Sequence, residues 1–277
     1  MSPIGIIAAA ITTLVVVVSI VVVAGYWRTS HAIRGDVDRL LASARPMPSA
    51  ITDETLATLP PPARRYFRHA GVVGKPIPRI VRLAQRGRIR SSGEANWMAL
   101  EADETYSTSP PAFVWQAFLP SRVTPIALGR DEYLGGQGSI LIRLLGLVPV
   151  ADEHGDELKA AGLMRYLNEA MWFPAALLGP NAVITAVDET SFRITLSDRG
   201  DTAEALFIVD ADGRLVNFRA QRYNTGTRSI ETWETPVGGY RDFDGLSLPS
   251  TGSAVWKLAT GDLTYIELEI SSITNEY

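Results

Sequence analysis

Hydrophobic residues follow three different patterns along the chain. Residues 4–24 are uncharged and almost wholly apolar, and residues 158–178 repeat apolar side chains every three or four positions. Residues 79–150 and 183–275 instead alternate between apolar and polar side chains. The alternation is typical of strands with one buried face, whereas the longer period is typical of an amphipathic helix. Because the strands do not alternate with helices, we expect one continuous antiparallel sheet and not a parallel α/β fold.

The apolar segment, IGIIAAAITTLVVVVSIVVVA at residues 4–24, carries no charge. As a helix rising ~1.5 Å per residue it would extend roughly 30 Å, the thickness of the hydrocarbon core of a bilayer. Tyr26 and Trp27 follow at the position of an interfacial aromatic belt. A signal peptide cleaved after Ala24 is the alternative, but its apolar core is usually about 7–15 residues long and follows a basic residue. We therefore expect residues 1–27 to be a retained, single-pass membrane anchor.

Residues 28–50 are expected to form a juxtamembrane linker, a short helix followed by the proline-containing run ARPMPS. The arginines of this stretch favour a cytoplasmic domain by the positive-inside rule, but large domains often cross a membrane regardless of flanking charge. Both sides of the membrane therefore remain open. Residues 51–277 contain no repeat, low-complexity tract or second boundary, so we expect a single α+β domain.

Helix and turn signals divide this domain further. Thr52 or Asp53 can cap a first helix, the prolines at 60–62 end it and begin a second, and Gly71 terminates the second. The helix that starts near residue 158 is expected to break before Pro174, because the residue before a proline avoids the helical conformation. The runs LGGQG, DADG and DFDG are expected to be tight turns between strands.

The composition excludes several kinds of chemistry. The net charge is −4 and no basic run is interleaved with aromatics, so we expect no nucleic-acid partner. The absence of cysteine excludes disulfides, thiolate metal sites and cysteine nucleophiles. The histidines, His31, His69 and His154, show no metal-ligand spacing, and no Gly-x-Ser-x-Gly run occurs. We therefore expect no metal and no cofactor, and we assign no catalytic residue.

The run RYLNEAMWF carries a second, polar stripe beside its apolar face. Arg165, Glu169 and Trp172 lie at positions i, i+4 and i+7 of the predicted helix. An exposed Arg–Glu pair would contribute only a few tenths of a kcal/mol. Arg222, in NFRAQRY, falls on the apolar face of its strand, where a charge needs a partner. We predict that Glu169 pairs with Arg222 as a buried link between helix and sheet; a ligand-orienting or catalytic role for the stripe remains open.

The runs LPPPARRYFRHAG, PPAFVWQAF, DEYLGGQG and LMRYLNEAMWFPAALL, together with FRAQRY, resemble a bacterial family of membrane-anchored proteins known only as a domain of unknown function. The resemblance covers roughly residues 55–275, and RYLNE…W.P.ALL is its most specific part. It brings no established activity. In its order of strands and helix the chain is similar to the lipoprotein-carrier fold, which implies a curved antiparallel half-barrel wrapped over one or two helices, with an apolar cavity between them.

We therefore expect a membrane-anchored domain, not an enzyme, that binds a hydrophobic, lipid-like ligand between sheet and helix. Its partner would be a membrane lipid or a hydrophobic small molecule, and the sequence does not indicate an oligomeric state. The alternatives are an interaction or scaffold domain with a filled core, and a hydrolase that pairs Glu169 with Asp131, Glu231 or Glu234. The candidate ligand-binding residues are Arg165, Glu169, Trp172, Trp115, Tyr133 and Arg222.

The anchor can be tested by cell fractionation. We predict that the full-length chain sediments with membranes and resists extraction by alkaline carbonate, because residues 4–24 span the bilayer. A chain of residues 30–277 should be soluble. Recovery of a mature protein whose first residue lies near Gly25 would contradict the anchor and show that the segment is a signal peptide.

Overall fold

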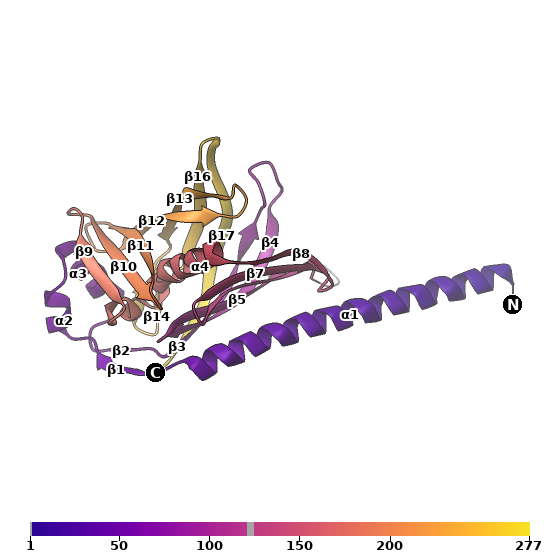
Figure 1. Cartoon of the computed structure of the whole chain (residues 1–277), viewed down its shortest axis with the longest axis horizontal. Helices are drawn as coiled ribbons and strands as arrows, with labels where there is room; N and C mark the ends of the chain where they lie inside the picture. Colours follow the sequence, from indigo (N-terminus) through magenta and orange to yellow (C-terminus); the bar gives the residue numbers. More distant parts are fainter. Residues whose placement is uncertain (1, 121–124) are drawn as a thin grey trace.

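The computed structural model describes residues 2–120 and 125–277, and a single antiparallel sheet of 13 strands dominates it (Figure 1). The sheet curves into an open half-barrel, which confirms the α+β fold expected from the sequence. Both alternating regions of the chain join this one sheet, as predicted. From one edge to the other, its strands are β8 (Val148–His154), β7 (Gln137–Leu144), β6 (Ala127–Leu134), β5 (Pro111–Leu119), β4 (Met98–Thr108), β3 (Ile80–Ile89), β17 (Gly261–Glu276), β16 (Thr251–Leu258), β13 (Ser229–Gly238), β12 (Leu215–Asn224), β11 (Asp201–Val209), β10 (Ser191–Asp198) and β9 (Ala182–Ala186).

The last strand, β17, joins the two halves of the sheet, because it pairs with β3 on one side and with β16 on the other. A Cβ atom at Gly87 would overlap the carbonyl oxygen of Glu267, so glycine is required where β3 and β17 come closest. On the outer face, Arg86 bonds Glu269 and Arg88 bonds Glu267 across the same two strands. Arg86 and Arg88 of β3 thus lie on a solvated strand face and have partners on β17.

The central helix, α4 (Asp156–Glu169), lies on the concave face of the sheet, as expected (Figure 1). A short 3-10 helix, η1 (Ala170–Trp172), extends it, and a second, η2 (Pro174–Leu178), follows the predicted break at proline. The backbones of β7 and α4 touch at Gly138, where a Cβ atom would overlap the carbonyl oxygen of Leu158. This contact holds the start of the helix against the sheet.

Two further helices cover the end of the half-barrel near β9 and β10. The first, α2 (Asp53–Ala57), is capped by the Thr52 hydroxyl, and the second, α3 (Pro61–Ala70), ends at Gly71 in the left-handed conformation, as the sequence predicts. Tyr66 and Phe67 pack there against aromatic rings of β10 and β11, which fill that end of the core. Two small two-stranded sheets complete the fold, β1 (Met47–Ala50) with β2 (Pro76–Ile77) and β14 (Arg241–Phe243) with β15 (Leu246–Leu248).

The N-terminal helix, α1 (Pro3–Ser43), is continuous and projects from the body of the molecule (Figure 1). It includes an 18-residue window of mean hydropathy 3.0 that makes no buried contact, and it is long and apolar enough to span a membrane. The short helix expected within residues 28–50 is present, and it continues the apolar segment without a break. Its apolar residues recur every three or four positions, so Ile33 and Leu40 pack on the outer face against β5 and β6. Asp36 pairs there with Arg130 of β6 at 2.7 Å.

We predict that Leu40→Ala lowers the free energy of unfolding by about 2–5 kcal/mol, because it removes a fully buried side chain between α1 and the sheet. The exposed Arg34 is the control, and Arg34→Ala should change the value by less than about 0.5 kcal/mol. Urea unfolding of the full chain in detergent, followed by tryptophan fluorescence, measures both. Equal stability of Leu40→Ala and the wild type would show that this half of α1 does not belong to the folded body.

Candidate functional site

A partly enclosed cavity of about 620 Å³ lies between α4 and the concave face of the sheet. This volume is within the range of about 300–1,000 Å³ that small-molecule sites occupy. Most of its wall is apolar, and four of the chain's six tryptophans contribute to it, namely Trp115, Trp172, Trp233 and Trp256. The site is therefore suited to a hydrophobic group.

The cavity exists because small residues stand in register across three strands. Ala102 of β4 is paired with Ala117 of β5, which is paired with Gly129 of β6. A Cβ atom at Gly129 would be in ordinary van der Waals contact, 3.9 Å from the Cβ atom of Ala117, and both residues line the cavity. On the opposite wall, Ala161 of α4 is also small. Aromatic side chains fill the other end of the half-barrel, whereas this row consists of alanine and glycine.

One wall of the cavity carries a cluster of charged residues centred on Arg165 of α4. Its guanidinium lies 2.9 Å from Glu169 on the same helix, 2.6 Å from Asp131 of β6 and 3.1 Å from Glu104 of β4. The guanidinium also lies over the ring of Trp115, 4.8 Å from its centre. One cation therefore links the helix to two strands of the sheet.

Gln85 of β3, which does not line the cavity, joins this cluster to Trp115 through hydrogen bonds. Its amide nitrogen donates to Glu104 at 2.9 Å, and its amide oxygen accepts a hydrogen bond from the indole nitrogen of Trp115 at 3.0 Å. Glu104 and Gln85 are both buried. The chain of bonds fixes the orientation of Trp115, so the charged cluster also shapes the apolar wall.

The cluster holds more negative than positive charge, and this perturbs its carboxyl groups. Burial raises the pKa of Glu104 well above its usual range, and the negative charge of Glu169 raises it further. Burial also raises the pKa of Glu169, although the charge of Arg165 opposes this shift. A proton shared between the two carboxyls therefore reduces the repulsion around Arg165. Asp131, whose side chain is 16% exposed, is on the cavity wall, while Glu104 is completely covered.

Arg222 lies on the cavity wall, as the alternation of its strand predicts, but the predicted pairing with Glu169 is wrong. Glu169 bonds Arg165 on its own helix. The guanidinium of Arg222 instead lies over the ring of Trp233, 4.5 Å from its centre, and donates to the carbonyl oxygen of Ala161 at 3.3 Å. An aromatic face and a helix carbonyl thus take the place of the expected carboxylate.

The cavity brings together five of the six residues that the sequence suggested. Trp172 lines it and donates from its indole nitrogen to the carbonyl oxygen of Pro249 at 3.0 Å. Tyr133 is the exception, because it is buried beneath α4, where its ring faces Gly162 and its hydroxyl donates to Asp198 at 2.7 Å. Tyr133 supports the helix and is not part of the wall.

Sequence reasoning missed Glu104 and Gln85, although the alternation of their strands contained the signal. Glu104 has the same parity as the buried Ala102 and Tyr106, and Gln85 has that of Leu83. Among the acids considered as partners of Glu169, Asp131 alone reaches the cluster. Glu234 instead bonds Arg219 at 2.6 Å, and Glu231 accepts a hydrogen bond from Ser229.

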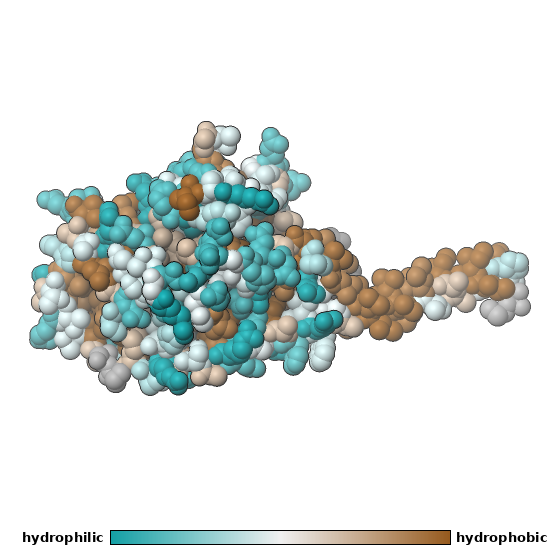
Figure 2. Space-filling view, in the orientation of Figure 1, coloured by the Kyte–Doolittle hydropathy of each residue, from teal (hydrophilic) through white to brown (hydrophobic). Residues whose placement is uncertain are grey.

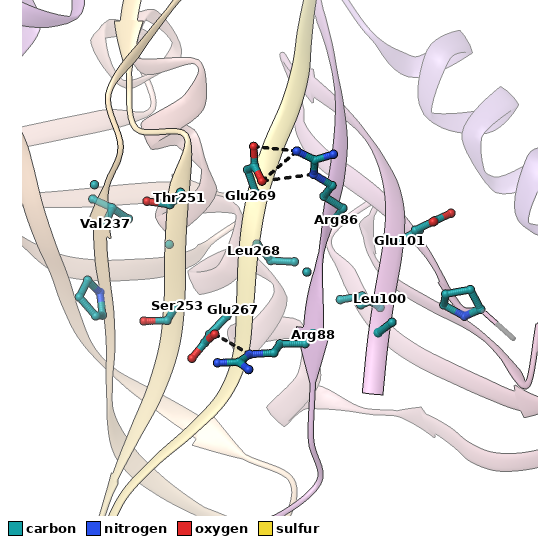
Figure 3. Close-up of a pocket in the computed structure, with 16 residues that line it drawn as sticks. Arg86, Arg88, Leu100, Glu101, Val237, Thr251, Ser253, Glu267, Leu268 and Glu269 are labelled. Atoms are coloured by element: carbon teal, nitrogen blue, oxygen red, sulfur yellow. Dashed lines mark hydrogen bonds and ion pairs between the residues drawn. The ribbon is translucent and has the colours of Figure 1, made fainter. Parts of the chain in front are cut away.

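A second hollow, an open groove of about 870 Å³, lies on the outer face of the sheet (Figure 3). Figure 3 shows that four of its five charged side chains already face one another, Arg86 with Glu269 and Arg88 with Glu267. Since these groups satisfy one another in solvent, the inner cavity is the stronger candidate for a binding site.

The raised pKa of Glu104 predicts a pH-dependent contribution to stability. The folded protein retains a proton that the unfolded chain loses near its ordinary value of 4.5, so this stabilisation is complete below that pH and is lost as the pH rises through the folded pKa. We predict that the stability of the wild type relative to Glu104→Gln falls as the pH rises from about 4.5 to 8. The exposed Glu204→Gln is the control. Urea unfolding across this range measures the difference, and a difference that rises or stays constant would contradict the shared proton.

Comparison with known proteins assigns a family to this fold. No curated protein matches the chain. Two solved structures are similar to it: a LolA superfamily protein, NE2245, from Nitrosomonas europaea (10% identity, TM-score 0.43, covering 82% of this chain and 95% of that one), and a DUF1329 family protein from Desulfovibrio piger ATCC 29098 (11% identity, TM-score 0.42, covering 79% and 94%). Both scores are low, so the function proposed below rests on the geometry of this chain. The model of a family of unknown function, DUF6544, matches residues 49–268, and the chain belongs to that family.

Proposed function

We propose that this protein is a membrane-anchored binding protein whose cavity takes the hydrophobic part of a lipid-like molecule. The observation that carries the proposal is the cavity of about 620 Å³, lined by tryptophan and aliphatic side chains, between α4 and the sheet. Burial of about ten methylene groups would contribute about 8 kcal/mol, from which the cost of ordering the ligand is subtracted.

Charged groups on the wall favour a ligand with one anionic end. The Arg165 cluster has its own carboxylates, whereas no carboxylate among the described residues lies within ion-pair distance of Arg222. A carboxylate or phosphate at Arg222 would complete the pairing of this half-buried charge. The acyl part would then lie along Trp233 and Trp256, over which Arg222 already extends.

The arrangement of the carboxyl groups favours binding over hydrolysis. A hydrolase that uses two carboxyls needs them on opposite sides of the bond to be cleaved. Here Glu104, Asp131 and Glu169 all bond the same guanidinium, and Glu104 is completely covered. The open volume beside them also counts against a scaffold domain with a filled core.

Contacts of α1 with the body support a retained anchor. The helix does not end where a signal peptide would be cleaved, after Ala24, but continues to Ser43. Gly25 and Tyr26 touch the turn between β7 and β8, so the apolar segment and the folded body form one continuous unit. A cavity for lipid would therefore be held close to a bilayer.

We predict that Ala117→Leu weakens the binding of cis-parinaric acid by about tenfold, because its added carbons occupy the space of two or three methylene groups. The matched control is Ala186→Leu on the exposed edge strand β9, which should bind like the wild type. Energy transfer from the cavity tryptophans to the probe measures binding by the full chain in detergent. Equal affinity in all three proteins, or no binding by the wild type, would contradict the proposed site.

A further inference from the structure

The turn between β7 and β8 is fixed against the N-terminal helix at the point where the helix meets the body. A Cβ atom at Gly146 would lie 2.6 Å from the Cα atom of Tyr26, and the Leu147 side chain packs onto Gly25. The buried hydroxyl of Thr29 donates to the carbonyl oxygen of Gly146 at 3.0 Å. These contacts set the height of the turn along α1.

This height coincides with the surface of the membrane that α1 would span. Residues 3–24, with a rise of 1.5 Å each, extend ~33 Å beyond the contact, the thickness of a hydrocarbon core. Tyr26 and the exposed Trp27 would then lie at the level of the lipid head groups. The β7–β8 turn, which touches Tyr26, lies at the same level.

The surface of the hairpin changes from apolar to charged with distance from this contact. Its exposed apolar side chains lie next to the turn, while the far end of β8 carries charged and polar side chains. Figure 2 shows apolar surface on the end of the body from which the helix emerges. With apolar side chains near the turn and charged side chains far from it, the hairpin can insert its turn partly into a bilayer. The exposed apolar residues at this end are Ile126, Leu144, Leu145, Val148 and Val150.

An apolar strip leads from the turn into the cavity. Leu144 of β7 and Val148 of β8 are paired directly beside the turn. Ile142 and Ile140 follow on the same face of β7, two residues apart, and both line the cavity. An acyl chain could thus remain in contact with apolar side chains from the turn to the cavity.

We propose that the β7–β8 hairpin rests on the lipid bilayer and is the portal through which an acyl chain passes between the membrane and the cavity. The portal rests on the proposed function, because it assumes that the cavity takes lipid. Contact of the turn with the bilayer depends only on the position of α1. The two parts can therefore be tested separately.

Membrane contact can be measured by site-specific labelling, since the chain has no cysteine. Leu145→Cys and Val148→Cys, each labelled with nitrobenzoxadiazole, are reconstituted as full chains in phosphatidylcholine vesicles that contain a spin-labelled acyl chain. Val183→Cys and Ile230→Cys, at exposed apolar positions away from the turn, are the controls. We expect quenching at the turn and none at the controls. Quenching no stronger at the turn than at the controls would overturn the proposal, as would a blue shift without quenching, which would mean that a second copy of the chain covers the hairpin.

Passage through the portal can be measured as the rate at which cis-parinaric acid moves from vesicles into the cavity. The double variant Leu144→Asp, Val148→Asp changes exposed side chains that do not line the cavity, and circular dichroism verifies its fold. We expect transfer several-fold slower than in the wild type, with unchanged equilibrium affinity in detergent. Equal transfer rates would overturn the portal. A wild type that binds no probe in detergent would overturn the proposed function and the portal together, while quenching at the turn would still support membrane contact.

Discussion

The structure depends on one guanidinium, that of Arg165, which bonds carboxylates from α4, β4 and β6 at once. Removing these charges from water is costly, and buried ion pairs are often no more stable than apolar packing. The ion pairs therefore act mainly by fixing the position of α4. The helix can lie over the sheet only where Glu104 and Asp131 reach Arg165. The hydrogen bond from Gln85 to Glu104, and that from Trp115 to Gln85, transmit this position to the cavity wall.

The cavity follows from this constraint together with the choice of small residues. Helix α4 touches the sheet at Gly138 near its start and through Arg165 near its end. Ala117 and Gly129 lie in register on the sheet beside the cluster, and they do not fill the space that the helix leaves. A helix free to move would collapse onto them, because apolar interiors pack closely. These contacts, the packing of Gly162 of α4 on Tyr133, and a row of small residues thus leave an open site, which is the basis of the proposed ligand binding.

Local patterns in the sequence predicted the elements well. Alternation identified the strands, and Thr52, Gly71 and Pro174 marked the limits of helices, because caps, turns and prolines act over a few residues. Partners across the fold were harder to predict. The inward direction of Arg222 followed from parity, but its partner, Trp233, depends on the register between β12 and β13. Glu104 stood at an inward position of a strand and was overlooked, although an acid there requires a cation. The continuity of α1 was also missed, because only its second half buries residues against the body, so the two halves carry different sequence patterns.

The central claim is that the space between α4 and the sheet holds a lipid-like molecule, and native mass spectrometry of the full chain, extracted from membranes in mild detergent, tests it most directly. The account predicts a wild-type mass increased by one bound lipid and an Ala117→Leu variant from the same membranes that carries little or none. A wild type detected only at the mass of its polypeptide, or an adduct that Ala117→Leu retains in full, would contradict the claim.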